Sequence, residues 1–137
     1  MLSLTHASVG AVAGEFIPNP FLAFLVGIIL HLIFDKIPHF WPKESKKKGV
    51  IIVLDTVFSL AFIVSLFFFP IHNQASVIAG AIGGVSVDFY FVLIMRSKGK
   101  WAQWHTNRQH HMVNPWWLLT DASILSLFLY LLTVVAK

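Results

Sequence analysis

Long apolar runs constrain this chain more than any other feature of its sequence. Three of them, residues 50–69, 75–95 and 116–136, have the roughly 20 apolar residues that a helix needs to cross the hydrocarbon of a bilayer. A fourth, residues 20–36, is slightly shorter and ends at a lysine whose long side chain can reach the interface. Only 12% of the residues are charged, against about 25% in a soluble domain. The runs predict an all-α membrane protein.

The first apolar stretch, residues 3–16, is different because it would form a helix of only about 21 Å. It is followed by the sequence IPNP, in which Pro18 and Pro20 break a helix. We expect a short, partly inserted helix that turns here and returns as the next segment. The predicted fold is a single domain over residues 1–137, with four transmembrane helices plus this short N-terminal helix.

The charged loops predict the orientation of the chain. Residues 35–49 and 96–111 hold most of the lysines and arginines, whereas the connection at residues 70–74 has none. The excess of positive charge on cytoplasmic loops places both basic loops in the cytoplasm. Since the basic residues lie beside apolar runs, we expect membrane lipids as partners and no nucleic acid. The chain has no cysteines, which excludes disulfides and thiolate metal sites.

Four aspartates, Asp35, Asp55, Asp88 and Asp121, lie within or beside the apolar runs. An ionised aspartate at the bilayer centre costs about 2.5–3.5 kcal/mol, so such residues usually face a cavity, a partner or a metal. Counted from the ends of their segments, all four lie near the cytoplasmic side, and His6 joins them if the first helix starts there. We expect five helices to bring ionisable groups to one level.

Spacing along the segments indicates how these groups are directed. Residues four apart share one face of a helix, and small residues at that spacing let two helix backbones approach closely. Three such stripes occur: Ala23, Gly27, His31 and Asp35; Gly80, Gly84 and Asp88; and His6, Gly10 and Gly14. We expect each stripe to pack against a neighbouring helix and to carry its polar residues into the interior of the bundle.

Histidine and aspartate without cysteine suit a borderline or hard divalent ion. Zinc fits first, and manganese, iron or nickel also bind such donors. His31 and Asp35 can supply two ligands from one helical turn, and His6 and Asp88 can add ligands from other helices. A bound metal would lower the pKa of water and produce a nucleophile. Arg108, with the nearby Lys98 and Lys100, could then hold an anionic substrate.

Four motifs together carry a resemblance to a known family. They are THASVGAVAG near the start, HLIFDKIPH after the first full segment, the aspartate in GVSVDFYF, and HTNRQHH before the last segment. With them the chain resembles the YdjM-type family of small bacterial and archaeal inner-membrane proteins, described as metal-dependent hydrolases. The His-x-x-x-Asp pair is also similar to ligand pairs of the zinc-dependent phospholipase C and P1 nuclease group, although only one clear pair is present here.

The resemblance implies a prokaryotic inner (plasma) membrane protein, and the basic loops place the site on its cytoplasmic side. Together with the residue pattern it gives a candidate site in two parts. The candidate metal ligands are His6, His31, Asp35, Asp88, His110 and His111, and the candidate catalytic residues are Asp55, His105 and Arg108. His105, His110 and His111 do not share one helical face, so we expect one or two of them to bind.

Simpler interpretations remain open for several of these residues. Asp35 and His39 could be interfacial, and His31 with Asp35 could be a structural hydrogen-bonded pair. Asp55 could be a ligand, a partner that orients a histidine, or a salt-bridge partner of loop lysines. Asp121 could cap or orient its own helix.

Three functions follow from these alternatives. The first is a membrane-embedded metal-dependent hydrolase that acts on a phosphate or ester bond of a lipid or other amphiphile at the cytoplasmic interface. The second is transport of protons or divalent cations, because intramembrane aspartates and histidines also form proton relays. A chain this small would need an oligomer to form such a path. The third is a non-enzymatic scaffold in which the cluster is structural.

Overall fold

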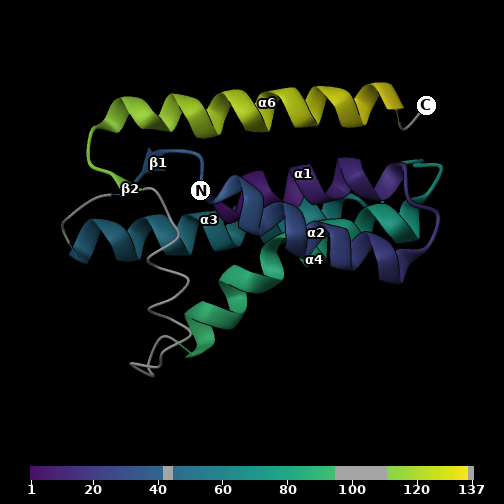
Figure 1. The fold of residues 1–137 in the computed structure, drawn as a ribbon, viewed down its shortest axis with the longest axis horizontal. Helices are drawn as coiled ribbons and strands as arrows, with labels where there is room; N and C mark the ends of the chain where they lie inside the picture. The colour runs from purple at the N-terminus through teal and green to yellow at the C-terminus, as the bar shows by residue number, and fades with distance from the viewer. Residues whose placement is uncertain (42–44, 95–110, 136–137) are drawn as a thin grey trace.

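The computed structural model describes residues 1–41, 45–94 and 111–135, and the regular elements in this part of the chain are helices apart from two very short strands. Figure 1 shows how these elements are arranged. In chain order they are α1 (Ser3–Glu15), α2 (Pro20–Phe34), β1 (His39–Phe40), α3 (Ser45–Ser65), α4 (Gln74–Ile94), β2 (His111–Met112), the 3₁₀ helix η1 (Pro115–Trp117) and α6 (Leu118–Val135).

The predicted break between the first two helices is confirmed. Helix α1 ends at Glu15, and α2 begins at Pro20, whose missing N–H and fixed φ suit the first helical position. The Asn19 side chain accepts hydrogen bonds from the backbone nitrogens of Phe21 and Leu22, at 3.0 and 3.2 Å. Asn19 therefore caps α2 and fixes the sharp reversal of the chain.

Helix α1 is the centre of the fold, a position that the sequence analysis did not predict. It contacts α2, α3, α4 and α6, and almost all of its residues are buried. In Figure 1, α6 runs along the top of the molecule with α1 beneath it. Alanine, glycine, serine and valine surround the axis of α1, and a helix without a distinct polar face can be covered from every side.

The three glycine stripes pack as predicted. A Cβ atom added at Gly10 would collide with the carbonyl oxygen of Gly80, and one added at Gly84 would collide with the carbonyl oxygen of His6. From α2, a Cβ atom at Gly27 would meet the same carbonyl oxygen of Gly80. The backbones of α1, α2 and α4 are therefore in direct contact, and we call these three helices the inner trio.

Helices α3 and α6 lie outside the inner trio. Residues Lys47–Ser65 and Pro115–Val135 are each long and apolar enough to cross a membrane, and Pro20–Phe34 is apolar but shorter. Of the four predicted transmembrane helices, two are therefore candidate membrane spans among the described residues. Large apolar side chains cover the outward surfaces of both helices: Phe58 is 57% exposed and Tyr130 is 65% exposed.

A pair of two-residue strands, which the sequence analysis did not predict, joins the loop after α2 to the segment before α6. Strands β1 and β2 run parallel, with His39 opposite His111 and Phe40 opposite Met112. The backbone nitrogen of Trp41 donates to the Met112 carbonyl oxygen at 2.8 Å and extends the pairing. Two segments far apart in the sequence are thereby held together at the end of the bundle where Asp35 lies.

Candidate metal centre

A buried aspartate bridges two histidines at the centre of the predicted site. Asp35 follows the last residue of α2, and its carboxylate lies beside the first turns of α1. Its Oδ1 atom lies 3.1 Å from His6 Nε2, and its Oδ2 atom lies 3.2 Å from His31 Nε2. The two imidazole rings are stacked with their centroids 3.8 Å apart. The predicted association of His6, His31 and Asp35 is confirmed, and all three side chains are buried.

The protonation of His31 is constrained by a backbone contact. Its Nδ1 atom lies 2.7 Å from the carbonyl oxygen of Gly84, which can only accept, so Nδ1 carries a proton. In the neutral imidazole Nε2 then presents a lone pair. That atom faces two carboxylates, Asp35 at 3.2 Å and Asp88 at 3.7 Å. A lone pair facing two anions is repulsive, so this arrangement calls for a cation, either a proton on Nε2 or a metal ion.

Asp88 completes the group from α4. Its Oδ1 atom faces His31, and its Oδ2 atom accepts a hydrogen bond from Ser3 Oγ at 2.6 Å. The Asp88 side chain is 17% exposed, whereas those of His6 and His31 are fully buried. Within this cluster, the side of Asp88 is therefore the more accessible one.

The geometry of His6, His31 and Asp88 fits a shared divalent ion. Each residue offers one ligand atom, and the three atoms all lie within 4.8 Å of one another. Tetrahedral zinc with bonds near 2.0–2.1 Å separates its ligand atoms by about 3.3 Å, so the widest pair would close by at most roughly 1.5 Å. Bonding of the opposite ring nitrogen to a backbone carbonyl, as His31 shows with Gly84, is the usual arrangement of a metal-binding histidine.

Two buried polar atoms around this group have no hydrogen-bond partner among the described residues. They are His6 Nδ1 and Asp121 Oδ2. A buried polar atom without a partner typically costs about 1–3 kcal/mol. The cost falls if a ligand, an ion or a water molecule satisfies the atom, so the region around α1 has unused capacity to bind a polar species.

Asp55 and Asp121 reach the same level as predicted, but their carboxylates mainly accept from backbone N–H groups at the start of α1, and Asp121 Oδ1 also accepts from the Thr5 hydroxyl at 3.5 Å. Asp55 accepts from the backbone nitrogens of Ser3 and Leu4, at 2.7 and 3.1 Å. Asp121 accepts from the backbone nitrogen of Leu2 at 2.9 Å. The side chain of Leu2 cannot cap α1, so carboxylates from α3 and α6 satisfy the free N–H groups of its first turn.

The remaining predicted residues are placed in part. His105, Arg108 and His110 lie outside the described residues. His111 lies in β2 and is half-buried, with its ring 5.1 Å from the ring of His39 and 5.4 Å from that of Trp41. It does not belong to the group formed by His6, His31 and Asp88.

His39 and His111 form a second pair of histidines beside the cluster. His39 Nδ1 donates to the carbonyl oxygen of Ile37 at 2.9 Å. Burial lowers the pKa of His39 from 6.5 to about 4, and the positive charge of the N-terminus acts in the same direction. Burial likewise lowers the pKa of His111. Both rings are therefore neutral near pH 7.

Sequence reasoning missed Ser3, because one serine at the start of an apolar stretch gives no signal. Only the packing of α1 against α4 brings its hydroxyl to Asp88. The nitrogen of Met1 also reaches the cluster and lies 3.4 Å from Asp35 Oδ1. The THAS motif could have drawn attention to this turn, since it holds His6 together with residues that can cap a helix.

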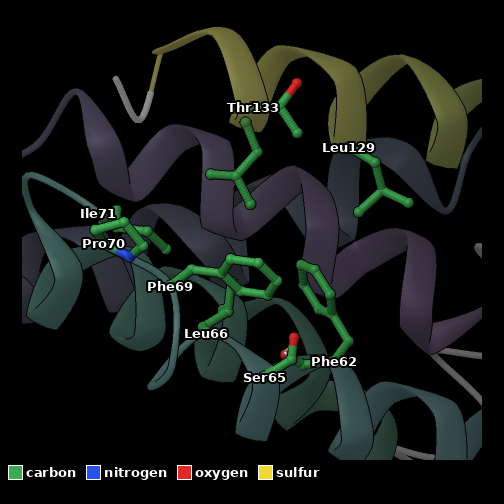
Figure 2. Close-up of a pocket in the computed structure, with 9 residues that line it drawn as sticks. Phe62, Ser65, Leu66, Phe69, Pro70, Ile71, Leu129 and Thr133 are labelled. Atoms are coloured by element: carbon green, nitrogen blue, oxygen red, sulfur yellow. Dashed lines mark hydrogen bonds between the residues drawn. The ribbon is translucent and has the colours of Figure 1, made fainter.

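An apolar cavity of about 440 Å³ lies at the other end of α3 and α6 (Figure 2). Phe62, Leu66 and Phe69 line one wall, and Leu129 lines another. The hydroxyl of Ser65, which also lines it, donates to the carbonyl oxygen of Phe62. The cavity is separate from the cluster, since Leu66 follows Asp55 by eleven residues, roughly 16 Å along a helix.

Comparisons of the chain with family models, with curated proteins and with solved structures gave no match. The resemblance to the YdjM-type family therefore stays a prediction, and the function is inferred from the geometry of the site.

Proposed function

We propose that this protein is a membrane-embedded, metal-dependent hydrolase, with a divalent ion bound by His6, His31 and Asp88. One observation carries the proposal. His31 Nδ1 is committed to the Gly84 carbonyl oxygen, while Nε2 faces the Asp35 and Asp88 carboxylates, so the site is built for a cation. Zinc is the first choice, because it accepts imidazole nitrogen and carboxylate oxygen together; manganese, iron and nickel are the others.

The membrane placement of the proposal is supported by the distribution of side chains. Polar residues such as His6, His31 and Asp35 are buried, whereas large apolar residues of α2, α3 and α6 are exposed. This pattern is the reverse of a soluble protein, in which large contiguous apolar surfaces are rare. We propose that four helices span a prokaryotic inner membrane, with the cluster at its cytoplasmic side.

The chemistry follows from the residues that surround the ion. A bound divalent ion would supply a Lewis acid and lower the pKa of a water molecule to near neutrality. Asp35 would orient His6 through its contact with Nε2, and the Gly84 carbonyl oxygen would orient His31 through Nδ1, in the manner of acceptors behind metal-binding histidines. The exposed side of Asp88 would face the substrate. We propose a phosphate or ester bond of a lipid as the substrate class, with Arg108 holding its anionic group and His105 assisting proton transfer.

Metal analysis of the purified protein tests the proposal. We expect about one zinc or similar divalent ion for each chain, and its loss in His31→Ala and Asp88→Ala. His72→Ala is the matched control, because His72 is an exposed histidine in the loop before α4 and should leave the metal content unchanged. Hydrolysis of phospholipid and ester substrates should follow the metal content. Wild-type protein that folds yet binds no divalent ion, even when dialysed against zinc, manganese, iron or nickel, would refute the metal site.

A second candidate, transport of protons or divalent cations, is favoured by the hydrogen-bonded series His6–Asp35–His31. Such a series can move a proton between its members. Flux measurements in proteoliposomes separate the two functions, since a hydrolase should show no ion flux that depends on His31. If the cluster is only a structural scaffold, alanine at His31 or Asp88 lowers stability and leaves both activities unaltered.

A further inference from the structure

We infer that Ser3 and Asp55 are positioning residues that aim the Asp88 carboxylate at the metal. The inference rests on the proposed function, because it concerns the same ion. It assigns roles that differ from those considered from the sequence: Ser3 was not a candidate, and Asp55 was a candidate catalytic residue, with a ligand, a partner that orients a histidine and a salt-bridge partner of loop lysines as alternatives.

Ser3 makes a short hydrogen bond to the Asp88 carboxylate. Ser3 Oγ donates to Asp88 Oδ2 at 2.6 Å, within the range of a charge-assisted O–H···O⁻ hydrogen bond. Ser3 is buried, so little water competes for this hydrogen bond. With Oδ2 held by the hydroxyl, the carboxylate cannot rotate freely, and Oδ1 stays directed toward His31 Nε2 at 3.7 Å.

Ser3 is itself held in place by Asp55. Its backbone nitrogen donates to Asp55 Oδ2 at 2.7 Å, and the next nitrogen, that of Leu4, donates to Asp55 Oδ1 at 3.1 Å. Both oxygens of Asp55 are thus engaged by the first turn of α1. The result is a continuous series from Asp55 on α3, through Ser3 on α1, to Asp88 on α4.

The role of Asp55 in this series differs from that of a metal ligand or a general base. The described partners of the Asp55 carboxylate are two backbone N–H groups, which engage both of its oxygens and hold it in place. Asp88 is the member that can reach the ion. Residues behind a metal ligand typically change affinity by 10- to 100-fold when they are removed. Ser3 and Asp55 are therefore expected to tune metal affinity without binding the metal.

Titration of the full chain with zinc tests the inference, with any purification tag at the C-terminal end so that the buried first turn of α1 stays unaltered. We expect zinc affinity to fall about 10- to 100-fold in Ser3→Ala and by a smaller factor in Asp55→Asn. Ser8→Ala is the matched control: Ser8 is also a buried serine of α1, but its hydroxyl donates to the Thr5 carbonyl oxygen. It should bind zinc as the wild type does.

Cobalt provides a readout that a merely structural role would not change. The visible absorption bands of bound Co²⁺ depend on the arrangement of the ligand atoms, so they should shift in Ser3→Ala and not in Ser8→Ala. Wild-type zinc affinity and an unshifted cobalt spectrum in a folded Ser3→Ala protein would overturn the role of Ser3, and wild-type affinity in Asp55→Asn would overturn that of Asp55. Failure of the wild type itself to bind metal would instead overturn the proposed function.

Discussion

The inner trio and the two outer helices differ in how they pack and in which side chains they bury. In α1, α2 and α4, glycines bring the backbones into contact, and the buried side chains include two histidines and an aspartate. In α3 and α6, large apolar side chains face outward, and one aspartate from each helix reaches the first turn of α1. The trio therefore contains the candidate chemistry, and the outer helices present an apolar surface while they secure α1 at one end.

The largest expected effect tests the backbone contacts of the inner trio. In Gly80→Val the new side chain would meet the Gly10 carbonyl group, which cannot move away without displacing α1. We expect a loss of more than about 3 kcal/mol in the free energy of unfolding, enough to prevent folding. Helical content and denaturant unfolding of the protein in detergent measure it.

The control for this prediction lies in an outer helix. Gly49 of α3 has open space where a Cβ atom would be, so Gly49→Ala should raise stability by up to about 1 kcal/mol through helix propensity. Equal behaviour of the two variants would show that the inner trio is not held by backbone contact.

Metal binding should stabilise the trio. Zinc at a free concentration of 100 times its dissociation constant should add about 2.7 kcal/mol to the free energy of unfolding. A chelator should remove this gain, and His31→Ala should show no zinc-dependent shift in the melting temperature. If zinc stabilises His31→Ala as much as the wild type, the ion binds elsewhere.

Removal of a carboxylate from an outer helix should have a moderate effect. Asp121→Ala leaves the part-buried backbone nitrogen of Leu2 without its acceptor, and the cost should lie near the lower end of the about 1–3 kcal/mol of a fully buried unsatisfied donor. The unfolding free energy should fall by that amount. Thr133→Val is the control on the same helix, because the Thr133 hydroxyl only donates to the Tyr130 carbonyl oxygen. An effect as large at Thr133 would argue against a special role for Asp121.

The smallest expected effect concerns pH and the strand pair that joins the two regions. The pKa of His39 is about 4 in the folded protein, because of burial, and near 6.5 when unfolded. Between these values the unfolded chain binds more protons, so the contribution of neutral His39 to stability is full above pH 6.5 and is lost as the pH falls toward 4. His111, which faces His39, has a pKa lowered by burial and adds to the same trend.

His39→Phe should flatten this pH dependence when unfolding is measured from pH 7 to pH 4. His72→Gln should preserve it, because His72 is exposed. A wild-type slope that survives in His39→Phe would assign the pH dependence to other groups.

Local patterns explain why much of the site could be predicted. The stripe from Ala23 to Asp35 depends only on the 3.6-residue period of a helix, so the sequence places His31 and Asp35 on one face. The turn at Asn19 follows from proline geometry. Counting along the segments also brought Asp55, Asp88 and Asp121 to one level, which the hydrogen bonds around α1 confirm.

Contacts between distant segments explain what could not be predicted. One interpretation of Asp121 was that it caps or orients its own helix. Its carboxylate instead accepts from the backbone nitrogen of Leu2 at the start of α1, because α6 packs alongside α1. The pairing of His39 with His111 likewise joins residues 72 positions apart, and two-residue strands carry no periodicity to detect.

The sequence by itself determined the helices, their glycine faces and the residues able to bind a metal, since these depend on local periodicity and composition. Only the tertiary structure decided that the shortest predicted helix lies at the centre, with Ser3 set against Asp88. The physical reason is that α1 is covered with small residues on every side. The stripe of His6, Gly10 and Gly14 marks one packing face, but the small residues around the rest of the helix do not indicate what covers its other sides, which is decided by the helices that close around it.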